Sequence, residues 1–179
     1  MEIKFTLDET DYLAYQLNVS SKSGRIKKKM INYRAGLTLG YLVVSASMFN
    51  LNEMAMGYVS LFCGIYIALK YPSIVMKRRK KEYLTQIREL LKNNFGKEND
   101  ISITDEHIEI TDFGGESKIK LEQIVEIIET DDHYFIPFLS GQALIIPKKK
   151  TDNLLELKGG MDSLISKLHL NHHLELDQK

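Results

Sequence analysis

Two long apolar runs, separated by a short polar break and flanked by basic residues, constrain this chain more than any other feature. The runs cover about residues 35–51 and 54–71, and their only charged residue, Lys70, lies at the end of the second. Seventeen or so helical residues extend over roughly 25 Å, the short end of what a bilayer core of roughly 30 Å requires. The sequence therefore predicts a transmembrane helical hairpin over residues 33–71, with its turn at Asn50, Asn52 and Glu53.

The basic residues are concentrated beside these runs. Of the 24 Lys and Arg residues, 12 lie between Lys22 and Lys81, where Glu53 is the only acid, so the rest of the chain is net acidic. Positive flanks stay on the cytoplasmic side of a membrane. We therefore expect a bacterial cytoplasmic (inner) membrane protein with both termini in the cytoplasm. A soluble hairpin buried in a core is the alternative, and a cleaved signal peptide is disfavoured because a second run follows the first.

A membrane location suggests two sets of functional residues. Basic side chains near lipid attract anionic headgroups, each by about 1 kcal/mol, and small residues at helix-face spacing let helices approach closely. The small residues pack either the two helices of one chain or two copies in a homodimer; Gly and Ala are also simply common in membrane helices. The hypothetical lipid-facing residues are Lys27, Lys28, Lys29, Lys77, Arg78, Arg79, Lys80, Lys81, Lys148, Lys149 and Lys150, and the helix-packing residues are Gly36, Gly40, Ser60, Gly64 and Ala68.

The segments on either side of the hairpin have patterns of their own. Residues 1–24 predict a short strand and a helix capped by Thr6 and Glu9, followed by a flexible joint over residues 18–24. Residues 77–96 have the apolar spacing of an amphipathic juxtamembrane helix, with Gly96 as its left-handed stop. The basic end of this helix lies at the membrane, and its mixed-charge part favours docking on the domain that follows.

From residue 99 the apolar period changes to two. Strand-length runs separated by short turns predict an antiparallel meander, because the links are too short for crossover helices. A closing helix over residues 152–168 is weakened or split by Gly159 and Gly160, and residues 169–179 form a polar tail. We expect an α+β fold, a small antiparallel-sheet domain resembling a pleckstrin-homology domain with a C-terminal helix, into which the membrane hairpin is inserted near the start.

The order of these elements resembles the YcxB-like membrane proteins. The resemblance is carried by residues 5–12, by the two apolar runs with basic flanks, and by residues 118–130 leading to the Ile-Pro-Lys of residues 146–148. It implies a membrane-anchored cytoplasmic domain of pleckstrin-homology type, and it carries over no catalytic residue.

The sequence offers weak candidates for chemistry. His169, His172 and His173 are close enough to bind a metal but lack a positioned carboxylate or Cys, and the single Cys63 excludes an intramolecular disulfide. Acids beside His133 lack a nucleophile and oxyanion donors, so they and this histidine are expected at the surface. The turn over residues 112–115 lacks the flanking elements of a phosphate loop. We expect no catalytic residue, no metal and no cofactor.

Three functions fit these observations. The first is a non-enzymatic membrane protein whose cytoplasmic domain binds a protein partner or anionic lipid. The second is an immunity protein that protects a bacterial cell from a toxin, which a neighbouring toxin gene would favour. The third is an accessory subunit of a membrane transporter or sensor, which would purify with its partners from detergent. Nucleic acid is a poor partner, because the soluble segments are net acidic.

Overall fold

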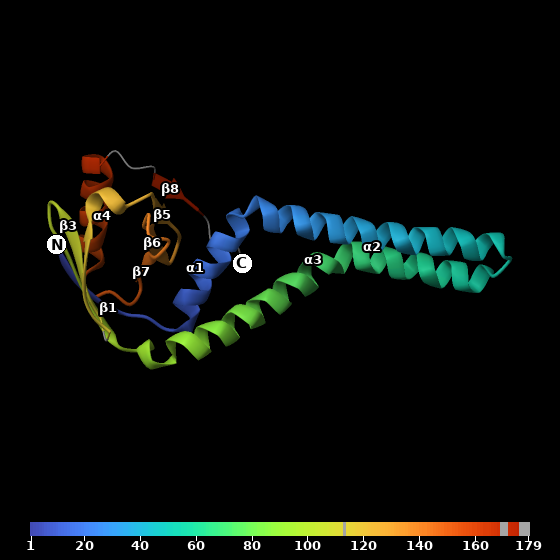
Figure 1. Cartoon of the computed structure of the whole chain (residues 1–179), viewed down its shortest axis with the longest axis horizontal. Coiled ribbons are helices and arrows are strands. Elements are labelled where there is room, and N and C mark those ends of the chain that lie inside the picture. Colours follow the sequence, from blue (N-terminus) through green and yellow to red (C-terminus); the bar gives the residue numbers. More distant parts are fainter. Residues whose placement is uncertain (113, 169–171, 176–179) are drawn as a thin grey trace. The chain divides into compact units, whose positions relative to one another are not determined.

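The computed structural model describes residues 1–112, 114–168 and 172–175. The chain forms two compact units: Met1–Tyr15 together with Ile87–Lys179, and Gln16–Gln86 between them. The first unit is the α+β domain, and the second is a helical insertion between its first and second strands (Figure 1).

The first sheet of the α+β domain is an antiparallel meander of β1 (Glu2–Thr6), β2 (Glu98–Ile103), β3 (His107–Asp112) and β4 (Gly115–Lys120). Ile3 pairs with Ile101 although the whole helical insertion lies between them in sequence. One face of the sheet is apolar, with Ile3, Phe5, Ile101 and Ile108 buried. The period of two therefore places these side chains in one core.

The second sheet has the order β7 (Ala143–Pro147), β6 (His133–Pro137), β5 (Ile127–Glu129) and β8 (His172–Leu174). Its first three strands are antiparallel, as predicted, and β8 runs parallel to β5 where the sequence indicated only a polar tail. A short 3-10 helix, η2 (Leu121–Gln123), precedes β5, which has three residues. Pro137 ends β6 and Pro147 ends β7, and a missing N–H donor is tolerated at a strand end.

A C-terminal helix, α4 (Leu154–Leu168), completes the domain core with Leu157, Met161 and Leu164 buried. The prediction that the glycine pair splits this helix is wrong. A Cβ added at Gly160 would lie 1.9 Å from the sulfur of Met1, so this glycine makes room for the N-terminus to pack on α4. The packing gained there offsets the low helix propensity of glycine.

Two boundaries differ from the prediction. Helix α1 (Glu9–Lys22) continues through the expected joint, and only Ser23 separates it from α2. The hydroxyls of Ser20 and Ser21 donate to carbonyl oxygens of the preceding helical turn, so serines here do not break the helix. The expected separate helix over residues 77–96 is the second part of α3 (Met54–Leu91), and η1 (Lys92–Asn94) follows it. Gly96 has the left-handed φ of 70° expected for the stop.

The second unit contains α2 (Gly24–Asn50) and the first part of α3, which run antiparallel (Figure 1). Their turn has the geometry of a Schellman motif: Asn52, with φ 59°, donates to Phe49 O and Glu53 donates to Met48 O at 3.0 Å. The polar break therefore turns the chain where it was predicted to.

Only one of the two predicted membrane spans has the necessary length and hydropathy. Among the described residues, one helix is long and apolar enough to cross a membrane: Met54–Asn94, which is α3 together with η1. The uncharged part of α2 covers residues 35–50, because Arg34 precedes it and the helix ends at Asn50. The run that begins α3 extends over residues 54–76 with Lys70 as its one charge, so it reaches the roughly 20 residues that a span requires, whereas the segment of α2 falls short of them. The predicted pair of membrane spans is thus supported for one helix only.

Candidate functional site: a buried Asp, His and Lys network

The start of α1 is fixed by two aspartates rather than by the predicted Thr6 and Glu9. The carboxylate of Asp8 accepts from the N–H groups of Thr10 at 2.8 Å and Asp11 at 3.3 Å, while the Asp11 carboxylate accepts from the Asp8 N–H at 2.8 Å. This reciprocal arrangement is a capping box shifted by two residues. It points both carboxylates toward Lys150, in the segment after β7.

Asp11 is the centre of a buried ionic network. Its residue surface is 3% exposed, and its carboxylate accepts from Lys150 Nζ at 2.6 Å and from His133 Nε2 at 2.9 Å. Lys150 also donates to Asp8 at 2.6 Å. A buried carboxylate persists only when it is paired and hydrogen-bonded, and here a helix cap, a lysine and a histidine satisfy it together. The network thus joins α1 to β6 and to the segment after β7.

His133 lies inside the domain, contrary to the expectation of a surface residue. Its ring stacks on Phe135 with centroids 5.3 Å apart and 14° between the planes. Since the Asp11 carboxylate accepts, Nε2 carries the hydrogen, and Nδ1 is buried with no partner among the described residues. The bond to Asp11 and the stacking on Phe135 thus hold the ring in one orientation.

The charges of the network shift its pKa values. Burial raises the pKa of Asp8, but hydrogen bonds from Lys150 and Thr10 outweigh it and hold the pKa well below its ordinary value. Burial lowers the pKa of Lys150, and its contacts with Asp11 and Asp8 outweigh this and raise it. Both ends of the pair are therefore charged at neutral pH.

A second cluster lies around Glu129. Lys148 Nζ donates to the Glu129 carboxylate at 2.7 Å and to Thr130 O at 2.6 Å, and it lies 4.6 Å from the centre of the Tyr134 ring. The Tyr134 hydroxyl and His172 Nε2 each lie 3.0 Å from the same carboxylate. Burial opposes ionisation of Glu129, but Lys148 and Tyr134 lower its pKa on balance. Burial and the bond to Glu129 raise the pKa of Tyr134.

The predicted basic triplet is committed to carboxylates of the domain. Lys148 pairs with Glu129, Lys150 with Asp8 and Asp11, and Lys149 with Asp132 at 2.7 Å. The side chain of Lys148 is 11% exposed. These pairs disfavour lipid contact by Lys148 and Lys150, and they explain why three lysines follow β7.

The histidines and the tight turn have local partners. His172 and His173 lie 3.0 Å and 3.4 Å from Glu129 and Glu126, and His169 lies outside the described residues. Within residues 1–112, 114–168 and 172–175, no group of three His, Cys, Asp or Glu side chains is arranged to hold a metal ion. In the turn between β3 and β4, Asp112 Oδ1 accepts from the Gly114 N–H at 2.7 Å; Phe113 lies outside the described residues.

The small residues are divided between the helix contact and the surface. Ser60 donates to Tyr41 O at 3.1 Å, and a Cβ added at Gly64 would lie 3.0 Å from the Tyr41 Cβ, so both lie where α3 meets α2. Ala68 is half-buried. A Cβ added at Gly36 or Gly40 would meet nothing within 4 Å, so these two lie away from the contact.

Sequence reasoning missed two residues of the contact between the helices. Ser45 donates to Gly57 O at 2.9 Å, and a Cβ added at Gly57 would lie 2.7 Å from the Phe49 ring. A serine facing a glycine across the hairpin was the available signal. Hydroxyl-to-carbonyl bonds of this kind join helices where water is scarce.

Acid should weaken the α+β domain through Asp8 and Glu129. Their folded-state pKa values lie below the ordinary 3.8 and 4.5, so the stability they contribute is complete above about pH 4.5 and is lost as pH falls through the folded values. We expect the melting temperature of the full-length protein in detergent to fall between pH 5 and pH 3. The Asp8→Asn, Glu129→Gln double variant should melt lower at pH 5 and fall less steeply. An unchanged slope would contradict the assignment.

The α+β domain defines the class of this protein. It contains two antiparallel meanders in separate sheets, a parallel strand, β8, that extends the second sheet, and a helix after the last meander strand. Residues 103–155 match the family described as YcxB-like protein. The match covers most of the two meanders and supports the relationship indicated by the sequence; residues 5–12 and the apolar runs lie outside it. No curated protein and no solved structure was found to match the chain.

Proposed function

We propose that this chain is a non-enzymatic integral protein of the bacterial inner membrane, whose YcxB-like domain, of pleckstrin-homology type, is held in the cytoplasm to bind a protein partner or anionic lipid. The observation that carries the proposal is the outer surface of α3. Large apolar side chains cover it, and Val59, Phe62 and Leu69 are 59%, 71% and 69% exposed. Only 6% of the apolar stretch of this helix is buried by the rest of the protein. Such an exposed apolar surface needs a hydrocarbon environment.

The pairing of β1 with β2 determines how the helices cross. The residues before α2 and after α3 belong to one hydrogen-bonded sheet, so they lie on the same side of a bilayer. A single crossing by α3 would separate them. If α3 spans the membrane, α2 must therefore return the chain across it despite its shorter apolar segment. Tyr33 and the flanking basic residues help, since aromatic rings and long basic side chains reach the interface from a short span.

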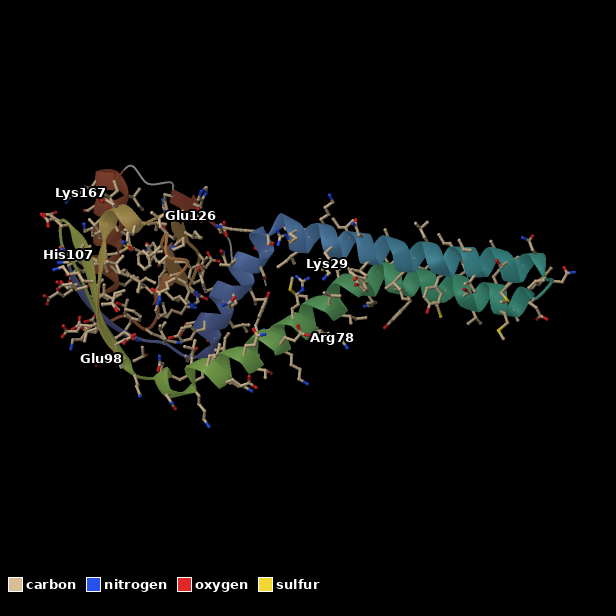
Figure 2. The ribbon with its side chains drawn as sticks, in the orientation of Figure 1. Lys29, Arg78, Glu98, His107, Glu126 and Lys167 are labelled. Atoms are coloured by element: carbon tan, nitrogen blue, oxygen red, sulfur yellow. The ribbon has the colours of Figure 1, made fainter. Side chains whose placement is uncertain are left out.

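Charge supports the cytoplasmic placement of the domain. Figure 2 shows Lys29 on α2 and Arg78 on α3 at the end of the helix pair that lies away from its turn. The basic clusters on the two helices thus share one side, and positive flanks stay in the cytoplasm. The turn at residues 51–53 then lies outside.

Cysteine labelling tests this topology. In a Cys63→Ser background, a membrane-impermeant maleimide should label an Asn52→Cys variant from outside intact spheroplasts. A Glu116→Cys variant, at an exposed position of β4, should be labelled only after lysis. The reversed pattern would overturn the orientation. Labelling of both positions only after lysis would overturn the crossing itself.

A further inference from the structure

A groove on α2 combines basic and apolar groups in the order that a phospholipid has them. The cavity has a volume of about 670 Å³ and is lined by Arg25, Lys28, Lys29, Asn32, Tyr33, Gly36 and Leu37. These residues form two adjacent rows, 25-29-33-37 and 28-32-36, each with steps of four, so they share one face of the helix. From one end to the other the lining changes from three cations, through an amide and a phenol, to glycine and leucine.

The groove faces away from α3. Side chains of α2 that meet α3 include Tyr41, Ser45 and Phe49. Toward the start of α2 the half-buried positions are Ile26, Met30 and Thr38, and none of these lines the groove, whereas every lining residue is exposed. Lys27 is not among the lining residues. An outward groove on a membrane helix is open to lipid.

The chemistry of the groove selects an anion at its basic end. Helix α2 contains no Asp or Glu, so no acid of the helix itself neutralises the three cations. Lys29 Nζ lies 5.9 Å from the centre of the Tyr33 ring, which keeps the ammonium beside the aromatic residue at the boundary between the basic and apolar parts. Below it, Gly36 has nothing within 4 Å of an added Cβ, so there is room for an acyl chain beside Leu37.

We propose that this groove binds an anionic glycerophospholipid of the cytoplasmic leaflet, with its phosphate among Arg25, Lys28 and Lys29 and its glycerol and first acyl carbons along Tyr33, Gly36 and Leu37. The inference rests on the proposed membrane insertion, which places this end of α2 at the headgroup level. It assigns lipid selectivity to one face of one helix, whereas general attraction by all the basic residues would not distinguish α2 from α3.

Native mass spectrometry of the full-length protein in detergent tests the assignment, with phosphatidylglycerol and phosphatidylcholine of identical acyl chains as probes. The wild-type protein should bind phosphatidylglycerol at least about tenfold more tightly. An Arg25→Gln, Lys28→Gln, Lys29→Gln variant should lose this preference, since each charge near the surface contributes roughly fivefold. The matched control, Lys77→Gln, Arg78→Gln, Arg79→Gln, removes the same charge from α3, outside the groove, and should lose clearly less of the preference than the groove variant does.

Three results would overturn the proposal: no preference in the wild-type protein, equal losses in the two variants, or displacement of the lipid by millimolar glycerol 3-phosphate. The last would mean that a soluble phosphate is the ligand. Membrane insertion is read separately from the cysteine labels. Correct labelling with no lipid preference rejects the groove alone, whereas failed labelling rejects the proposed function.

Discussion

Replacing Asp11 with alanine should lower the free energy of unfolding of the α+β domain by about 3 kcal/mol, because removing one partner of a buried ionic network leaves the others buried without compensation. Lys150 keeps Asp8 and some water, but His133 Nε2 loses its acceptor inside the domain. For a domain of about 100 residues this corresponds to a fall in melting temperature of roughly 10–20 °C. Near-UV circular dichroism of the full-length protein in detergent measures it through the domain tyrosines.

The matched control is Asp105→Ala. Asp105 pairs with Lys167 at 2.6 Å, the same distance as Asp11 and Lys150, but its side chain is 96% exposed. Exposed pairs contribute at most about 1 kcal/mol, so this variant should melt within a few degrees of the wild-type protein. If the melting temperature fell by a similarly small amount in both variants, the buried Asp11 network would not stabilise the domain more than an exposed ion pair does. Since the lysine pairs of the two aspartates agree in chemistry and distance, the difference between the variants measures burial together with the bonds that Asp11 makes to His133 and to the Asp8 N–H.

The sequence predicted the elements of the α+β domain better than the contacts between them. Period-two runs located most strands of both meanders, because alternation reflects a sheet with one buried face. The strand β8 was missed, since its residues His172 and His173 are polar and pair only at a sheet edge. The glycine pair of α4 was misread, because nothing in the local sequence indicates that Met1 packs there.

The buried network was missed for a related reason. Asp8 and Asp11 had a capping signal three residues apart, but Thr6 and Glu9 have the same spacing, and local sequence cannot choose between them. The choice is made by Lys150, which lies more than 100 residues further along the chain and meets both aspartates. His133 likewise was expected at the surface, because its partner in α1 is distant in sequence. Charge pairs between distant segments have no signature in periodicity.

The two apolar runs show the opposite balance. Composition alone identified both apolar runs and the turn between them, because solvation by lipid depends on the side chains of one segment and not on distant partners. The prediction of two spans is supported for α3 only, since Arg34 and the end of the helix at Asn50 limit the apolar part of α2. In the proposed topology α2 must cross with α3 because β1 pairs with β2, which is a property of the fold.

Two lysines in the middle of the apolar run of α3 should therefore prevent insertion of both helices. Phe62 and Ile65 are 71% and 48% exposed on this helix, where a lipid-facing charge has no protein partner. Each Phe→Lys or Ile→Lys change disfavours insertion by roughly 3 kcal/mol, and the two together by roughly 6 kcal/mol. Because α2 cannot cross alone while β1 stays paired with β2, the Phe62→Lys, Ile65→Lys protein should be absent from floated, carbonate-washed membranes.

Flotation separates this outcome from aggregation, since aggregated protein sediments and does not float with lipid. The control places the same two lysines at Leu90 and Leu155, which are 81% and 84% exposed but lie outside the apolar run. That variant should float with the membranes as the wild-type protein does. If the α3 variant floats equally well and its turn is still labelled from outside, the apolar surface of α3 is not what inserts the chain. Failure of the α3 variant alone would identify that surface as the membrane anchor, because both variants gain the same charge.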